Sequence, residues 1–306
     1  MKTVFVGTPR FADIALKRLI RNGETPSFVV TVTDKKAGRG QQLSPSPVKE
    51  TATEKGIRVV EVEDKDTFHN IIKEEKPDIV IIAAFGIIIP QETLDLTTFL
   101  NIHPSLLPKY RGPSPIQSTI IDGVENTGVT IIEMDGKIDH GPIVAKSKVK
   151  LKEDVTYLEA EELLADEGAN LVFSVIQGEI KGEPQDDSEA TYTPKISKED
   201  GNIDWKESAE VIERKVRALN PWPGTFTYSD KGKIKILEGG VQEQTSDGPF
   251  GEIGKTYLAT NNHIAVQTGK DFFIIKKLQL EGKQPVTAKE FLNGNIQFFG
   301  CILKSS

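Results

Sequence analysis

The 306-residue sequence has one cysteine, Cys301, and four histidines. A disulfide requires two cysteines, and a structural zinc site requires a closely spaced set of Cys and His ligands. We therefore expect neither a disulfide nor a metal site in this chain. A single thiol is typical of proteins from a reducing compartment, which predicts a cytoplasmic location.

Long apolar runs are scarce as well. The longest, IVIIAAFGIII at residues 79–89, is well short of the roughly 18 residues that a membrane-spanning helix needs. The N-terminus runs directly into a strand-like pattern and lacks the profile of a secretion signal. We therefore expect no membrane association, and we interpret residues 79–89 as a buried parallel strand with its exit loop.

The composition is not basic either, because the net charge is −7. This value argues against a general nucleic-acid coat protein. The charge is nevertheless uneven, since residues 208–306 carry 13 Lys and Arg against 10 Asp and Glu. An anionic partner is expected to meet that part of the chain or a local basic loop, although ordinary scatter of surface charge explains so small an excess equally well.

The first half of the sequence alternates short apolar runs with amphipathic ones. Thr8 and Pro9 are typical of an N-cap and a first-turn proline, and they predict a helix that ends at Asn22-Gly23. Short strands separated by helices predict a mostly parallel, doubly wound α/β sheet, whose ligands bind at the carboxyl ends of the strands. Strands are expected at 3–7, 27–33, 57–62, 78–84 and 98–103, two more extended runs within 128–149, and further helices at 67–76 and 154–178.

The second half predicts a different domain. Residues 181–207 are polar, interrupted by prolines and without a period, which is typical of a linker. After an amphipathic helix, short β-like runs separated by glycine turns predict a small barrel or sandwich. We therefore expect a first domain at 1–183, a linker at 184–207 and a second domain at 208–306.

Two polar side chains stand at the end of the strand predicted at 98–103. Residues two apart on a strand point to the same face, so Asn101 and His103 face one volume of space. In a core, each needs an internal hydrogen-bond partner to offset a desolvation cost of about 1–3 kcal/mol. In a cleft, an amide donor and an imidazole are suited to stabilising an oxyanion and moving a proton. Spacing alone leaves both interpretations open.

Asp139, in the segment DGKIDHGP, is either an ordinary turn residue or the carboxylate that orients a catalytic His103. Ser105 is not expected to be a nucleophile, because the chain has no G-x-S-x-G elbow, and we expect it to brace its loop.

The turn GTPRFA, residues 7–12, has a single glycine, which argues against a nicotinamide cofactor.

Two longer segments resemble the signature of the folate-dependent formyltransferases. They are NIHPSLLPKYRGPSPIQ at residues 101–117 and GVTIIEMDGKIDHGPIV at residues 128–144. DKKAGRGQQLSPSPVK at 34–49 and RALNPWPGTF at 217–226 resemble the branch of that family that acts on methionyl-tRNA. The match covers nearly the whole chain in order. It implies a Rossmann-like first domain, mostly parallel, followed by a small OB-like β-barrel domain.

The resemblance implies transfer of the formyl group of 10-formyltetrahydrofolate to the amino group of methionine esterified to initiator tRNA, for translation initiation. Asn101, His103 and Asp139 would be the catalytic trio, in a protein that acts as a monomer and needs no metal. The folate is expected to contact two loops, made of Ser105, Leu106, Leu107 and Pro108, and of Phe85, Gly86 and Ile87. The basic residues expected to bind tRNA are Lys35, Lys36 and Arg39.

Three alternatives remain at this point. A sister enzyme formylates a nucleotide-linked amino sugar, and the AGRG loop at residues 37–40 argues against it. A non-catalytic RNA-binding relative conflicts with the intact trio, and a hydrolase would release free formate. The sequence also departs from the family pattern, because many members read Asp-Thr-Gly-Asp where this chain has DHGP at 139–142. His140 and Pro142 are therefore unusual, as is Lys36 where a proline is common.

Overall fold

The computed structural model describes residues 1–37, 42–243, 251–259 and 263–305. Its chain divides into two compact units, each assembled from more than one segment. The first unit comprises residues 1–115, 126–151 and 158–193, and the second comprises residues 116–125, 152–157 and 194–306. No helix in the described part of the chain has the length and hydropathy required to cross a bilayer.

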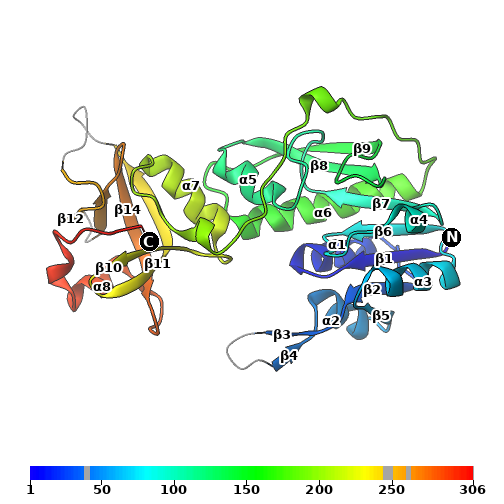
Figure 1. Cartoon of the computed structure of the whole chain (residues 1–306), viewed down its shortest axis with the longest axis horizontal. Coiled ribbons are helices and arrows are strands. Elements are labelled where there is room, and N and C mark those ends of the chain that lie inside the picture. The colour runs from blue at the N-terminus through cyan, green and yellow to red at the C-terminus, as the bar shows by residue number, and fades with distance from the viewer. Residues whose placement is uncertain (38–41, 244–250, 260–262, 306) are drawn as a thin grey trace. The chain divides into compact units, whose positions relative to one another are not determined.

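The strands of the first unit form a mixed sheet (Figure 1). They are β1 Thr3–Gly7, β2 Phe28–Val32, β5 Arg58–Val62, β6 Ile79–Ala83, β7 Thr98–His103, β8 Asn126–Glu133 and β9 Ile143–Lys150. The strand order is β5-β2-β1-β6-β7-β8-β9. The first five strands in this order are parallel, whereas β8 and β9 run antiparallel to their neighbours. The mostly parallel, Rossmann-like sheet predicted from the sequence is thus confirmed.

Helices and one small hairpin complete the first unit. They are α1 Arg10–Arg21, α2 Pro47–Glu54, α3 Lys65–Glu75, α4 Gln91–Leu94, α6 Tyr157–Ile176, and the hairpin of β3 Lys35–Ala37 with β4 Gln42–Ser44. Helix α5, Pro115–Ile121, belongs to the second unit from Ile116 onward. The expected N-cap of α1 was wrong by one residue, since Pro9 occupies the cap and makes no side-chain cap bond. The Thr8 hydroxyl instead lies 3.3 Å from the hydroxyl of Thr31, at the end of the next strand.

Strand β7 shows how the two faces of the sheet differ. Phe99 belongs to a buried cluster that includes Phe68 of α3, so its side of β7 faces that helix. Ile102 points to the other side, where a Cβ built on Gly168 of α6 would lie only 2.4 Å from Ile102 Cγ2. Because side chains alternate along a strand, Asn101 and His103 lie on the face of Phe99 and away from α6.

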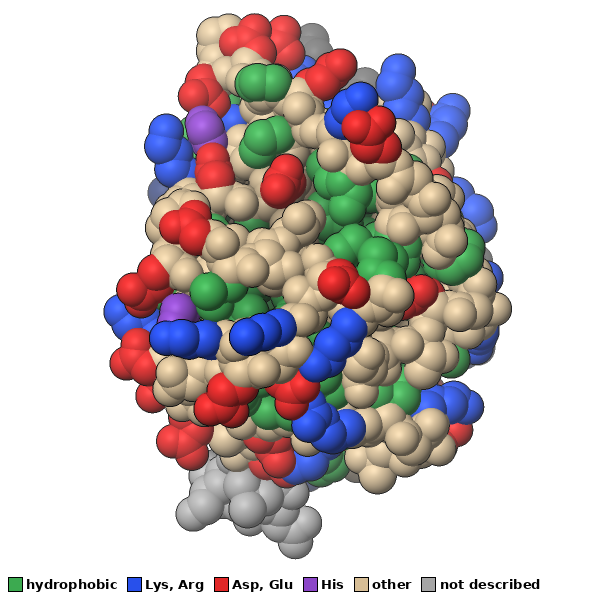
Figure 2. Space-filling view, turned by 90° about the vertical axis from the view of Figure 1, so that its right-hand side faces the viewer, with side chains coloured by type: hydrophobic (Ala, Val, Ile, Leu, Met, Phe, Trp, Pro, Cys, Tyr) green, Lys and Arg blue, Asp and Glu red, His purple; other side chains and the backbone are tan. Residues whose placement is uncertain are grey.

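One face of the molecule carries charges of both signs (Figure 2). On the face shown in Figure 2, Lys and Arg side chains are interspersed with Asp and Glu, and apolar side chains are exposed between them. Within the first unit, Arg10 and Glu161 form an ion pair of 2.6 Å that joins α1 to α6. The net charge of −7 is thus not accompanied by a uniform negative surface on this face.

The second unit is built on an antiparallel sheet. Its elements are α7 Ala209–Leu219, β10 Thr225–Ser229, β11 Gly232–Gln242, β12 Thr256–Leu258, β13 Ile264–Gln267, β14 Phe272–Leu280, β15 Val286–Thr287 and α8 Ala288–Asn293. The order is β10-β11-β14-β13-β12. Tyr228 of β10 bridges to Lys304, and Lys255 beside β12 bridges to Ile302. Residues 302–304 therefore join the two ends of the sheet, which gives the barrel expected from the sequence.

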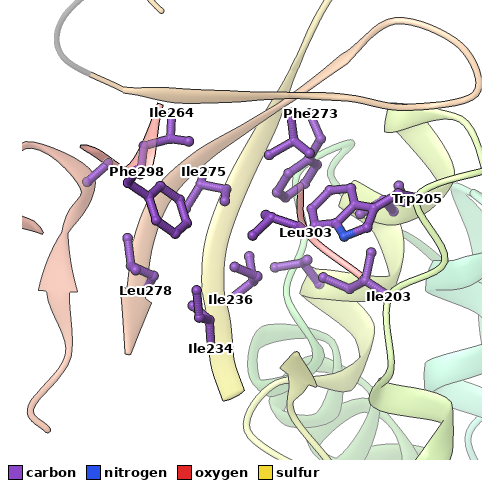
Figure 3. Close-up of a cluster of buried hydrophobic side chains, with 14 of the residues drawn as sticks. Ile203, Trp205, Ile234, Ile236, Ile264, Phe273, Ile275, Leu278, Phe298 and Leu303 are labelled. Atoms are coloured by element: carbon purple, nitrogen blue, oxygen red, sulfur yellow. The ribbon is translucent and has the colours of Figure 1, made fainter. Parts of the chain in front are cut away.

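An apolar cluster forms the core of this unit, where strands, α7 and α8 pack together (Figure 3). Phe273 and Trp205 lie with their ring centroids 5.8 Å apart, and the indole nitrogen of Trp205 donates a 3.0 Å hydrogen bond to the Thr227 hydroxyl. The indole is thus buried with its polar atom satisfied, as such a position requires. Of the labelled isoleucines, Ile234 and Ile236 come from β11, Ile264 from β13 and Ile275 from β14, so the inner faces of three strands meet in one cluster.

Ile236→Val is expected to lower the free energy of unfolding of the second unit by about 0.5–1.5 kcal/mol, because it removes one methyl group from a packed core. The chain's two tryptophans, Trp205 and Trp222, both belong to this unit, so tryptophan fluorescence during denaturation reports on it. Lys235→Gln, at an exposed position on the same strand, is the control and should stay within about 0.5 kcal/mol. Equal midpoints for Ile236→Val and the parent would contradict the core assignment.

Candidate active site

Asn101, His103 and Asp139, up to 38 residues apart in sequence, meet at the carboxyl end of β7. Asp139 Oδ1 lies 3.4 Å from Asn101 Nδ2 and 3.5 Å from His103 Nδ1. Both distances are longer than a typical N–H···O hydrogen bond, and the distance to His103 is within the range of an ion pair. The three side chains named from the sequence are therefore gathered around one carboxylate.

The ring of His103 is held from its other side. His103 Nε2 lies 2.9 Å from the backbone oxygen of Tyr110. A carbonyl oxygen only accepts, so Nε2 carries the hydrogen and Nδ1 is left facing Asp139 and Asn101. The residue is 4% exposed, and only a small part of the ring reaches the surface. The imidazole therefore has a hydrogen-bond acceptor near each of its ring nitrogens.

Asp139 adopts a backbone conformation that few side chains favour. Its φ of +48° is in the left-handed region, which is strained for a residue other than glycine. Its second carboxylate oxygen, Oδ2, accepts a 2.8 Å hydrogen bond from the backbone N–H of Gly112. Strained conformations of this kind are maintained only when the surroundings determine them, and they are common at functional sites.

The support comes from a segment that we name the strap, residues 183–193, which lies within the stretch interpreted from the sequence as a linker. Gln185 Nε2 donates to the backbone oxygens of Asp139 and Gly141, each at 2.8 Å. Gln185 Oε1 in turn accepts from Arg111, a guanidinium that is 1% exposed. Neither Arg111 nor Gln185 was singled out from the sequence, because nothing there distinguishes a buried arginine from an exposed one.

His140 connects the same loop to the strap through its two ring nitrogens. Its Nδ1 lies 2.5 Å from Asp135 Oδ2, and its Nε2 lies 3.3 Å from Asp187 Oδ2. Asp187 also accepts a 2.8 Å hydrogen bond from Arg111. That hydrogen bond lowers the pKa of the Asp187 carboxyl, and the positive charge of His140 acts in the same direction. The unusual histidine of this chain thus adds a side-chain contact between the loop and the strap.

The two loops expected to contact folate differ in which of their residues are buried. Phe85 and Ile87 are half-buried and pack on the cluster that contains Phe99, so they share a face of the sheet with Asn101 and His103; Gly86 is exposed. In the second loop the structure buries Ser105 and Leu107 and leaves Leu106 and Pro108 half-buried, with the Ser105 hydroxyl donating to the Lys109 oxygen at 2.7 Å. Ser105 thus braces its loop.

The basic residues expected to bind tRNA are described only in part. Lys35 and Lys36 belong to β3, where they pair with Ser44 and Leu43 of β4. Arg39 lies outside the described residues.

Comparison with known proteins decides the family. The family models for formyl transferase and for the formyl transferase C-terminal domain match residues 1–176 and 195–295. The chain belongs to the formyltransferase family. The formyltransferase is 38% identical to a methionyl-tRNA formyltransferase from Caldanaerobacter subterraneus subsp. tengcongensis, over 99% of this chain and 100% of that one. It is 36% identical to a methionyl-tRNA formyltransferase from Syntrophomonas wolfei, over 100% and 99% of the two chains.

A solved structure supports the fold of the formyltransferase. An N-formyltransferase from Helicobacter canadensis, in complex with folinic acid and dTDP-3-aminofucose, superimposes with a TM-score of 0.65 at 19% identity. The match covers 94% of this chain and 100% of that one. The trio of the formyltransferase combines an amide donor, an imidazole and a carboxylate around one position, which are the groups that acyl transfer to an amine needs.

Proposed function

We propose that the protein transfers the formyl group of 10-formyltetrahydrofolate to the free amino group of methionine esterified to initiator tRNA. The observation that carries the proposal is the convergence of Asn101, His103 and Asp139 at the carboxyl end of β7. Two relatives named methionyl-tRNA formyltransferase, each matched over nearly their full length, support the choice of acceptor. The protein is proposed to act as a cytoplasmic monomer.

In the proposed mechanism the amine of methionine attacks the formyl carbon. Negative charge then develops on the formyl oxygen, and the amide of Asn101 and the protonated ring of His103 stabilise it. Asp139 supports the positive charge on His103 and orients both donors. One C–N bond forms and the bond from the formyl carbon to the folate nitrogen breaks. The amine loses one proton, directly or through water to Asp139, and the leaving nitrogen gains one.

The residues fit a folate donor by their chemistry. Phe85 and Ile87 present apolar surface beside the exposed backbone of Gly86, on the same face of the sheet as Asn101. A flat aromatic ring system is suited to such a surface, with backbone groups to satisfy its polar edge. Leu106 and Pro108 offer a second half-buried surface. These residues would hold the donor, which supplies the formyl group.

The amino-sugar alternative is favoured by one observation, the superposition on the N-formyltransferase whose structure contains dTDP-3-aminofucose. A direct assay separates the alternatives. The purified full chain is incubated with 10-formyltetrahydrofolate and either methionyl initiator tRNA, an amino-sugar nucleotide or no acceptor. Formylation of the tRNA alone is expected. Formylation of the sugar instead, or release of formate without an acceptor, would overturn the proposal.

Arg39→Ala is expected to weaken the use of initiator tRNA far more than the binding of folate. Arginine neutralises phosphates and also reads base edges, so its loss should raise KM for tRNA by about tenfold, equivalent to about 1.4 kcal/mol. The measurement is KM for tRNA beside the dissociation constant for the folate. Arg21→Ala, at an exposed arginine of α1, is the matched control. Unchanged KM for tRNA in Arg39→Ala would remove this loop from recognition.

A further inference from the structure

Asp139 cannot keep its position through its own loop alone. Its left-handed backbone is less stable than the right-handed alternative for an aspartate, so neighbouring groups have to hold it. The N–H of Gly112 holds the carboxylate, at 2.8 Å. The backbone of Asp139 is held separately, by the amide of Gln185.

Gln185 clamps the loop on both sides of His140. Its Nε2 has two hydrogens, and the two nearby acceptors are the backbone oxygens of Asp139 and Gly141, each at 2.8 Å. The two carbonyls that bracket His140 are thus tied to a single side-chain nitrogen. Such an arrangement fixes the direction of the peptide groups that set where the Asp139 side chain points.

The orientation of the Gln185 amide is itself determined. Its Oε1 lies 3.1 Å from Arg111 Nε and 2.8 Å from Arg111 Nη2. A guanidinium only donates, so the oxygen of the amide must face Arg111 and the nitrogen must face the loop. Arg111 is 1% exposed, and its Nη2 also donates to Asp187, which keeps it in place.

The strap that carries Gln185 is fastened at both ends. At one end Glu183 and Ile143 exchange backbone hydrogen bonds of 2.8 and 2.9 Å. At the other, the N–H of Arg111 donates to Thr191 at 2.8 Å, and Arg111 accepts from the N–H of Thr193 at 2.7 Å. Gln185 therefore lies on backbone that is paired before and after it.

We propose that Gln185 is a positioning residue, which holds Asp139 against Asn101 and His103 and makes the strap part of the active site. The inference rests on the proposed function, because the position of Asp139 matters for the rate only if Asp139 takes part in formyl transfer. It extends the site to a segment that the sequence pattern assigns to a linker.

Gln185→Glu tests this role with little change in shape. The introduced carboxylate still accepts from Arg111, but its second oxygen faces two carbonyl oxygens where the amide donated. We expect kcat to fall about tenfold while KM for each substrate stays within about twofold, because alignment is lost and binding surfaces are kept. Gln177→Glu makes the same chemical change at an exposed position after α6 and should leave both constants unchanged.

Acid pH supplies a signature that loss of stability would not produce. Protonation of the introduced carboxyl restores one donor toward the loop, so the activity of Gln185→Glu relative to the parent should rise as the pH falls. The other charged groups around the loop, Arg111, Asp135, Asp139, His140 and Asp187, are the same in both proteins. The ratio of the two rates therefore isolates the new group.

A substrate-free measurement separates this inference from the proposed function. Hydrogen exchange of the backbone amides of residues 134–141 should be faster in Gln185→Glu and unchanged in Gln177→Glu. If the parent fails to formylate methionyl-tRNA, the proposed function is wrong, and the exchange result still tests whether Gln185 holds the loop. If the parent is active and Gln185→Glu matches it in kcat and exchange, the inference is overturned. A fall in kcat without recovery in acid would also overturn it.

Discussion

His103→Ala is expected to reduce kcat for formyl transfer by about 100- to 1,000-fold, as is typical for the loss of one oxyanion donor. The methyl group of alanine leaves Asn101 as the remaining donor to the formyl oxygen and removes the cation that Asp139 supports. The measurement is single-turnover formylation of methionyl initiator tRNA, with KM determined in parallel. KM should change little, because the interaction lost is one made in the transition state.

A matched control is available on helix α3. His69, whose Nδ1 lies 2.9 Å from the Thr93 hydroxyl, is a histidine of the same unit outside the trio. His69→Ala should retain nearly the parent rate. Asn101→Ala and Asp139→Ala are expected to resemble His103→Ala, and near-normal rates in all three would refute the assignment of the trio.

Gly141→Ala is expected to lower kcat by about 100-fold, because a displacement of about 1 Å at a catalytic group has effects of this size. A Cβ built on Gly141 would lie 1.8 Å from the backbone oxygen of Glu133. Backbone cannot move aside as the end of a side chain can, so the loop has to open. The opening displaces Asp139, two residues earlier, and one of the carbonyls that Gln185 binds.

Gly136→Ala controls for this change within the same loop. A Cβ built on Gly136 would meet the side chain of Gln91, whose Oε1 would lie 2.9 Å away, and that flexible amide can turn aside. Its activity should stay close to that of the parent. Thermal unfolding of both variants checks that the first unit remains folded at the assay temperature. Full activity of Gly141→Ala would show that the loop tolerates opening and that its geometry is not required.

Much of the fold could be predicted from the sequence because it depends on local patterns. The strands at 3–7 and 98–103 are bounded as the apolar runs predicted, and the alternation of strand and helix predicted the parallel part of the sheet. The shared face of Asn101 and His103 followed from the two-residue period of a strand. Thr8 was misassigned because a threonine before a proline has the same appearance whether it caps a helix or pairs with a neighbouring strand.

The remainder of the site could not be predicted, because it depends on contacts between distant segments. The approach of Asp139 to His103 arises from the return of β8 beside β7, and its left-handed backbone is not encoded by any local signal. Tyr110 and Gly112 act through backbone atoms, so their residue types do not indicate this role. Gln185 lies in a polar stretch without a period, where nothing marks one glutamine as functional.

The second unit draws on residues far upstream of Pro194, which affects how parts of the chain can be exchanged between relatives. Residues 116–125 and 152–157 group with it, and the Arg217 guanidinium donates to the backbone oxygen of Val155 at 2.7 Å. A chimaera that joins two homologues at one crossover near Pro194 would separate these segments from the helix they were selected to match. Recombination that respects the native contacts must transfer all three segments together.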